Sequence, residues 1–277
     1  LKKQTTYLIG VVVADIENIF SSILFKGADK VFERHGYQIL LMNSDNSGER
    51  EHEQLQRLLA LQVDGIILQP IHHEANRYKF IKDSDTPTVI VDRNITPHVW
   101  PEVTTDNYGY SKVLSELIVR MEYKRIITIS EPLADNEVRM ARYQAVQDTA
   151  KDTDVIIDSI EITGKTSDEL IYNQIMEKSD SLKAKTVIYA LKGTILIHVR
   201  KLLSKFHIVI PNDIGVTAFD DWDWAQLMQP EITTIQQNPK KMGQKSAEAL
   251  VSLLTKQPIS ENPILVESEL KIRNSLK

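Results

Sequence analysis

The chain has 277 residues, of which 42% are hydrophobic and 26% are charged, a composition typical of a globular protein that buries a sizeable core, so we do not expect disorder. The length exceeds that of a typical single core, so we expect two compact units of roughly 100–150 residues each. The net charge of −5 makes this stretch by itself a poor DNA binder, and the lack of cysteine excludes disulfides and thiolate metal sites.

The first predicted element is an apolar strand over residues 7–13, typical of a parallel strand covered on both faces. Such apolar runs are far shorter than the ~20 residues of a membrane-spanning helix, so we expect no transmembrane segment. The chain starts without Met and enters this strand within a few residues, with no apolar stretch ending in a cleavage site. We expect a truncated or processed end, and the absence of cysteine fits either the cytoplasm or the periplasm.

Strands and helices then alternate through the first half of the chain. An apolar stripe from Phe20 to Val31 predicts a helix that ends near Gly36. Further strands are predicted at residues 38–42, 65–68 and 88–91, and further helices at residues 49–61 and 74–83.

The same alternation predicts a second unit. Its helices are expected at residues 108–121, 137–150, 167–177 and 194–203, and its strands at residues 125–129, 154–160, 186–189 and 215–219. A short strand over 230–235 follows, then a helix over 240–256 that Asn238 and Pro239 introduce, and a final strand over 264–272.

This order of elements predicts an α/β protein with two doubly wound parallel sheets. Short loops between alternating strands and helices return the chain to the same edge each time, which makes the strands parallel. Ligands of such sheets bind beyond the carboxyl ends of the strands, so residues just after each strand are the candidates for a site.

Polar residues follow several strands of the first unit. Asp15 and Asn18 follow the first strand, where capping of the next helix and contact with a ligand are equally good interpretations. Gln69, Asp92 and Arg93 follow later strands, and a carboxylate and a guanidinium there suit a polyhydroxylated ligand. The alternative is a surface pair of Asp92 with Arg93; we favour the site for Asp92, and less strongly for Arg93.

In the second unit, Arg139 and Arg142 stand at the start of a helix, where a cation gains nothing from the helix dipole. This unfavourable placement indicates a functional role for the two arginines, although their solvation on an exposed turn is the alternative. Asp220, Asp221 and Trp222 close a buried strand. We expect Asp220 to hydrogen-bond a sugar and Asp221 to cap the next short helix; paired acids acting as a glycosidase are the alternative.

Other chemistry is not indicated. His72, His73 and Glu74 are adjacent, so we interpret them as solvated surface rather than a metal site. The sequence has no glycine-rich phosphate loop and no nucleophile elbow. We therefore expect no catalytic residue, no metal and no cofactor.

Taken in order, several stretches resemble the effector-binding core of LacI/GalR transcription regulators over essentially the whole chain. Each stretch is weak alone, but the ordered series is specific. The stretches are residues 9–16, Gly36-Tyr37 with 43–45, residues 63–67, Val91-Asp92-Arg93, residues 106–109, 139–143 and 211–216, Phe219-Asp220-Asp221, residues 230–237 and Met242-Gly243.

This resemblance implies a periplasmic-binding-protein-like fold with a three-crossover hinge. The first lobe would comprise residues 7–104 plus 236–258, and the second residues 105–235 plus 263–277. It implies a cytoplasmic homodimer that binds operator DNA through an N-terminal helix-turn-helix headpiece, which we expect this chain to lack. Ligand binding between the lobes would be coupled to operator affinity.

The resemblance also implies ligand-facing roles for Asp15, Asn18, Phe20, Gln69, Asp92, Arg139 and Asp220, to which we add Arg93, Lys192 and Trp222. The family usually places Asn-Asp where this chain has Lys192-Gly193. An added lysine favours an acidic effector, such as a sugar acid, a keto-acid or a sugar phosphate, although a solvent-facing Lys192 is the alternative. The sequence around Lys192 also resembles that of regulators of 2-keto-3-deoxygluconate utilisation.

The alternative function is a periplasmic sugar-binding protein of a transporter, which shares the fold. An export signal upstream would distinguish it from a regulator, whose upstream segment would be a helix-turn-helix.

Overall fold

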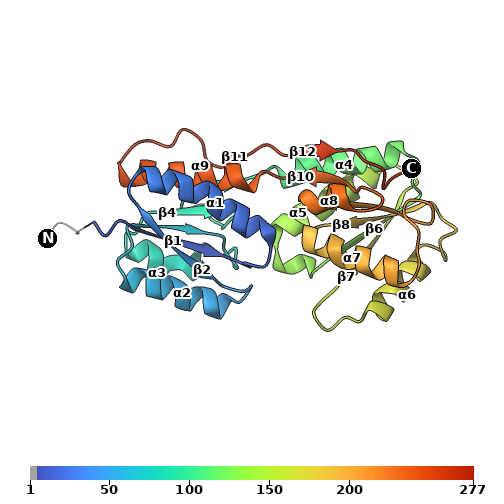
Figure 1. Cartoon of the computed structure of the whole chain (residues 1–277), viewed down its shortest axis with the longest axis horizontal. Helices are drawn as coiled ribbons and strands as arrows, with labels where there is room; N and C mark the ends of the chain where they lie inside the picture. The colour runs from blue at the N-terminus through green and yellow to red at the C-terminus, as the bar shows by residue number, and fades with distance from the viewer. Residues whose placement is uncertain (1–4) are drawn as a thin grey trace. The chain divides into compact units, whose positions relative to one another are not determined.

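A computed structural model describes residues 5–277 of the chain, and these residues form two compact units. The first unit comprises residues up to Thr105 together with Asn238–Glu267, and the second comprises Asp106–Gln237 together with Ser268–Lys277. The chain therefore passes from one unit to the other three times. Figure 1 shows the sheets and helices of each unit.

The first unit is built on a six-stranded sheet in the order β11-β5-β4-β3-β1-β2, with every neighbouring pair parallel. Its central strands are almost entirely buried, as strands covered by helices on both faces must be. The strands are β1 (Leu8–Val13), β2 (Gln38–Asn43), β3 (Gly65–Leu68), β4 (Thr88–Val91), β5 (Glu102–Thr104) and β11 (Ile264–Leu265).

The helices of the first unit are α1 (Ile19–Arg34), α2 (Gly48–Ala60), the 3-10 turn η1 (Ala75–Tyr78), α3 (Lys79–Asp83) and α9 (Pro239–Leu254). Helices α1 and α9 are far apart in the sequence but lie side by side in space (Figure 1). Glycines make this close approach possible: a Cβ atom on Gly27 would lie 2.0 Å from the backbone oxygen of Lys240, and one on Gly243 would lie 1.9 Å from that of Leu24.

The second unit repeats the architecture with the order β12-β10-β9-β8-β6-β7, in which only the β10–β12 pair is antiparallel. The strands are β6 (Arg125–Ser130), β7 (Ile156–Glu161), β8 (Thr186–Ala190), β9 (Gly215–Phe219), β10 (Thr233–Gln236) and β12 (Glu269–Lys271). The helices are α4 (Asn107–Arg120), η2 (Leu133–Asp135), α5 (Glu137–Ala150), α6 (Asp168–Lys178), α7 (Gly193–Lys205) and α8 (Asp223–Leu227).

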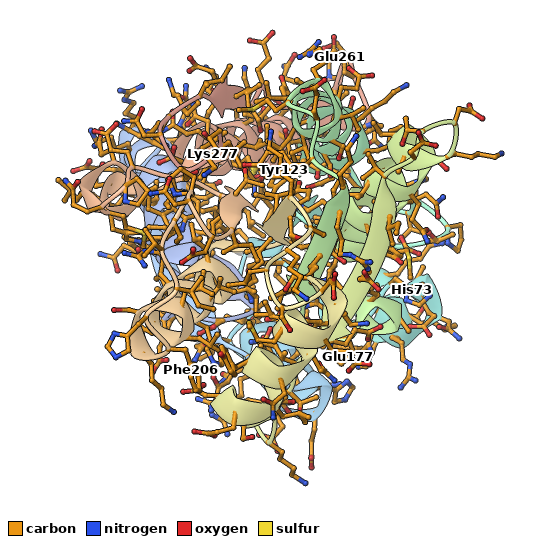
Figure 2. The ribbon with its side chains drawn as sticks, turned by 90° about the vertical axis from the view of Figure 1, so that its right-hand side faces the viewer. His73, Tyr123, Glu177, Phe206, Glu261 and Lys277 are labelled. Atoms are coloured by element: carbon orange, nitrogen blue, oxygen red, sulfur yellow. The ribbon has the colours of Figure 1, made fainter. Side chains whose placement is uncertain are left out.

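The C-terminal residues pack onto this second sheet. The backbone N–H of Lys277 donates to the Tyr123 hydroxyl at 3.1 Å, and Figure 2 shows these two residues close together. The Ser275 hydroxyl donates to the backbone oxygen of Val216 at 2.6 Å and accepts from the backbone N–H of Thr233 at 2.8 Å. The tail thus ties β9 to β10.

The predicted fold class is confirmed, and several elements differ in their bounds or pairing. The strand expected over 264–272 is two strands: β11 pairs with β5 of the first sheet, and β12 pairs with β10 of the second. Strand β5 was not predicted, because three residues are too few to show a periodic pattern. The strand expected from residue 230 begins only at Thr233. Among residues 5–277, no helix is both long and apolar enough to cross a membrane.

Candidate functional site

In the first unit, Gln69 connects the carboxyl ends of three neighbouring strands. Its side-chain oxygen accepts from the backbone N–H of Ala14, just after β1, at 2.9 Å, and its amide nitrogen donates to the Asp92 carboxylate, just after β4, at 2.7 Å. Gln69 itself follows β3 and is 4% exposed. The order of the sheet places β1, β3 and β4 side by side, so these polar groups meet at one edge.

Asp92 leaves that edge in an unusual backbone conformation, and Arg93 follows it. Asp92 has a φ of 68°, a left-handed value that Asp tolerates better than most residues. The Arg93 guanidinium donates to the backbone oxygen of Pro70 at 3.1 Å, and its Nε lies 4.0 Å from the Asp92 carboxylate. Both side chains are largely buried, so they are not the exposed surface pair that was the alternative.

Asp15, Asn18 and Phe20 lie at the start of α1. The Asn18 side chain caps the helix by accepting from the backbone N–H of Phe20 at 3.2 Å, and Asp15 accepts from the backbone N–H of Glu17 at 2.9 Å. Phe20 is buried, whereas Asp15 and Asn18 are partly exposed. The capping interpretation of Asn18 is therefore correct.

In the second unit, Asp220 occupies the position that corresponds to Asp92. It follows β9, has a φ of 92° and is 3% exposed. One carboxylate oxygen accepts from the Gln237 amide at 2.6 Å, and the other accepts from the backbone N–H of Gly193 at 3.0 Å. Asp220 thus fixes the start of α7 and the end of β10, roles that sequence reasoning did not anticipate.

Three charged side chains of the second unit meet at the carboxyl ends of the neighbouring strands β6 and β8: Glu131 after β6, Lys192 after β8, and Arg139 in the first turns of α5. The Glu131 carboxylate lies 2.9 Å from the Lys192 Nζ and 3.2 Å from the Arg139 Nη2. Burial alone would raise the pKa of Glu131, but the charges of Lys192 and Arg139 outweigh it and hold this pKa below its usual range. Lys192 is therefore paired with a carboxylate and is not the solvent-facing lysine of the alternative interpretation.

Trp222 and Gly193 pack against each other next to this group. A Cβ atom on Gly193 would lie 2.9 Å from the Trp222 Nε1 and 3.1 Å from the Asp220 Cβ. Trp222 is 6% exposed and is the residue that precedes α8. Glycine at position 193 thus lets the indole and the Asp220 carboxylate approach the N-terminus of α7.

Arg142, unlike Arg139, is a buried structural residue. Its guanidinium lies 3.7 Å from the centre of the Phe219 ring and donates to the backbone oxygen of Leu191 at 2.7 Å and to the Asn107 side chain at 3.0 Å. It therefore holds the residues that precede Lys192 and Asp220 in place.

Two sequence interpretations need correction. Asp221 does not cap α8, whose N-cap residue Trp222 makes no side-chain capping bond. Instead, the Asp221 carboxylate forms a buried ion pair with Arg273 at 2.6 Å and accepts from the Thr234 hydroxyl. The helix expected over residues 74–83 is instead the 3-10 turn η1 followed by the short helix α3. Within residues 5–277, no cluster of His, Cys, Asp or Glu is arranged to hold a metal ion.

Sequence reasoning missed Glu131 and Gln237. Each directly follows a strand, Glu131 after β6 and Gln237 after β10. The strand-end position that points to Asp92 and Asp220 is therefore the sequence signal for Glu131 and Gln237 as well.

Comparison with known proteins gives the family. The sequence profile described as "Periplasmic binding protein-like domain" matches residues 117–276. The HTH-type transcriptional regulator KdgR of Bacillus subtilis (strain 168) is 31% identical over the whole chain, which spans 82% of that regulator. The chain belongs to the LacI family of transcriptional regulators.

Other LacI-family proteins agree with this assignment. The ribose operon repressor of Bacillus subtilis (strain 168) is 27% identical over 95% of the chain and 79% of its own length. The crystal structure of a LacI transcriptional regulator from Lactobacillus brevis matches 95% of this chain and all of its own with a TM-score of 0.86 and 27% identity. A LacI-family regulator from Enterococcus faecium, solved with bound ribose, has the same fold, with a TM-score of 0.83 and 22% identity over 97% and 98% of the two chains.

Family membership decides between the classes of function. LacI-family members are regulators and not enzymes, so the glycosidase interpretation of Asp220 and Asp221 is excluded. The engagement of both carboxylates with protein donors agrees with this result.

Proposed function

We propose that the chain is the effector-sensing part of a LacI-family repressor and that its effector is a small sugar acid or related anion. The observation that carries the proposal is the meeting of polar groups at the carboxyl ends of the strands in each unit, Gln69 with Asp92 in one and Glu131 with Arg139 and Lys192 in the other. Relatives that act on the ribose operon, and the protein of the same fold solved with ribose, support a carbohydrate as the ligand.

The cations favour an acid over a neutral sugar. Arg139 presents a planar fork that matches a carboxylate or phosphate, and Lys192 adds a second positive charge. In the first unit, Asp15, Asn18 and Arg93 supply acceptors and donors suited to hydroxyl groups. We propose that the ligand is held by both units at once and that Phe20 and Trp222 contribute apolar surface.

Binding would act on DNA through linkage. A ligand that prefers one arrangement of the two units changes the affinity of a DNA-binding headpiece, and the coupling is reciprocal, typically ~1–3 kcal/mol. We propose that the regulator works as a homodimer in the cytoplasm, where its operator lies.

Thermal shift with a ligand panel tests this function. The panel contains D-gluconate, 2-keto-3-deoxygluconate, glucose 6-phosphate, D-glucose and D-ribose. A ligand at 100 times its Kd stabilises the folded protein by about 2.7 kcal/mol, so binding acids raise the Tm measurably. A rise with neutral sugars alone would contradict the acidic effector.

Replacing Arg139 tests the site. We expect Arg139→Ala to weaken acid binding at least tenfold, equivalent to about 1.4 kcal/mol, because a charge-assisted hydrogen bond is lost. The ligand-free Tm is the control for folding. An unchanged affinity would remove Arg139 from the site.

A further inference from the structure

Glu131 occupies the position where the acid of an effector would be expected to bind. Its carboxylate lies between the Nζ of Lys192, at 2.9 Å, and the Nη2 of Arg139, at 3.2 Å. The residue directly follows β6, at the edge of the sheet where ligands of this fold class bind. The two cations proposed to attract an acidic effector therefore already hold a carboxylate of the protein.

Glu131 also has the most exposed side chain of this group. Its side chain is 31% exposed, compared with 19% for Lys192 and 14% for Arg139. Its Oε1 accepts a hydrogen bond from Lys192, but its Oε2 lacks a partner of hydrogen-bonding geometry among the described residues. Arg139, in contrast, is anchored by donating to the backbone oxygen of Pro132 at 2.5 Å.

We propose that Glu131 is an internal competitor of the effector, and that an acidic effector binds by displacing the Glu131 carboxylate from Lys192 and Arg139. This inference rests on the proposed function, because it requires an anionic ligand at that site. Two carboxylates beside the same cations repel each other, so displacement is favoured over simultaneous binding. Glu131 is only partly buried, with a side chain that is 31% exposed, so its carboxylate can turn toward water while the more buried Lys192 and Arg139 stay in place.

This arrangement makes Glu131 a specificity-determining residue. A hydroxyl group is a weaker acceptor for a cation than a carboxylate is, because charge-assisted hydrogen bonds are roughly twice as strong as neutral ones. A neutral sugar therefore does not displace Glu131 and gains nothing from the two cations. Only a ligand with its own acidic group can replace the interactions that Lys192 and Arg139 lose when Glu131 is displaced.

Calorimetric titration of the full chain tests the proposal with a matched pair of ligands. D-gluconate and D-glucitol differ only in a carboxylate that replaces a hydroxymethyl group, and 2-keto-3-deoxygluconate and glucose 6-phosphate serve as further acids. We expect Glu131→Gln to tighten binding of the acids at least tenfold and to leave D-glucitol binding unchanged. Glu131→Asp, which keeps the charge on a shorter side chain, should lie between the wild type and Glu131→Gln.

A control variant separates this effect from a general change in charge. Glu169 pairs with Lys205 at the same 2.9 Å in the same unit, on the exposed surface of α6. Glu169→Gln therefore removes the same charge from the same kind of pair, and we expect it to leave every affinity unchanged. A stronger dependence of acid affinity on NaCl in Glu131→Gln would further support the proposal, because the cations would then be unpaired before binding.

The possible outcomes distinguish a failure of competition by Glu131 from a failure of the proposed acidic effector. If the wild type binds an acid and Glu131→Gln binds it equally or more weakly, Glu131 does not compete and the inference is overturned while the proposed function stands. If the wild type binds no member of the panel, or only the neutral sugars, both fail. Should Glu131→Gln not fold, Glu131→Asp decides: tighter acid binding supports competition, and unchanged or weaker binding overturns it.

Discussion

Asp92 and Asp220 occupy corresponding positions in the two units, at the ends of β4 and β9. Each ends a buried strand with a left-handed φ, 68° and 92°, and each receives a hydrogen bond from a glutamine amide, Gln69 or Gln237. A non-glycine residue in this region is strained by roughly 1–3 kcal/mol and persists only where its surroundings hold it. The hydrogen bonds from the two glutamine side chains stabilise this conformation at both strand ends.

Glu51 is a second residue whose surroundings set its chemistry. It lies on α2, is 1% exposed, and accepts from the Tyr78 hydroxyl and the backbone N–H of Ile71, both at 2.8 Å. Burial raises its pKa to about 7, and these hydrogen bonds offset only part of the rise. Glu51 thereby ties α2 to the segment that follows Gln69.

This pKa predicts a pH-dependent contribution to stability. The unfolded chain releases the Glu51 proton near pH 4.5 and the folded chain near pH 7, so the contribution of Glu51 is fully present below pH 4.5 and is lost as the pH rises to 7. The loss amounts to up to about 3 kcal/mol. Urea denaturation of the wild type and Glu51→Gln between pH 5 and pH 8 should show their stability difference shifting in favour of the variant as pH rises. A difference that stays constant with pH would place the pKa of Glu51 near its ordinary value.

Among the helices, the α1–α9 pair depends most on residue size. Gly27 and Gly243 let the two backbones touch, because a Cβ atom on either would lie about 2 Å from a backbone oxygen of the opposite helix. Backbone cannot move aside as a side chain does, so this contact specifies how a helix from the C-terminal part of the chain joins the first unit.

We expect Gly243→Ala to destabilise the first unit by at least about 1–3 kcal/mol, because the added methyl group overlaps the Leu24 backbone oxygen. Thermal melting measures the loss. Gly164→Ala is the matched control, since no atom lies within 4 Å of the added carbon, and its Tm should stay near that of the wild type. Equal melting of both variants would show that the helices separate at little cost.

On the scale of the whole molecule, the chain crosses between the units after Thr105, Gln237 and Glu267. Two of these crossings lie beside residues of the candidate site: Gln237 binds Asp220, and the Thr104 hydroxyl donates to the backbone oxygen of Asp92 at 2.9 Å. These contacts connect the candidate site of each unit to a crossing within that unit, and under the proposed function a ligand bound there would bias the connections between the units.

We expect a saturating concentration of the acidic effector to change the radius of gyration measured by small-angle X-ray scattering. Under the proposed function the ligand binds both units and so favours one relative arrangement of the units. Arg139→Ala at the same ligand concentration should show no change. If the wild type binds the acid with an identical scattering curve, the ligand does not act by rearranging the units.

The sequence by itself determined the number and order of most elements, the two parallel sheets and the strand ends at which polar groups gather. These features follow from hydrophobic periodicity and capping residues, which act over a few positions; helix α5, for example, has the predicted bounds. The resemblance to a regulator family was confirmed by the comparisons.

Only the tertiary structure decided which side chains meet. Glu131 and Lys192 are 61 positions apart, and Asp221 finds Arg273 rather than the helix that follows it. The C-terminal strand was likewise divided between two sheets by the partners available at each edge, β5 and β10. Long-range pairs depend on how complete sheets and helices pack, and no local pattern of residues carries that information.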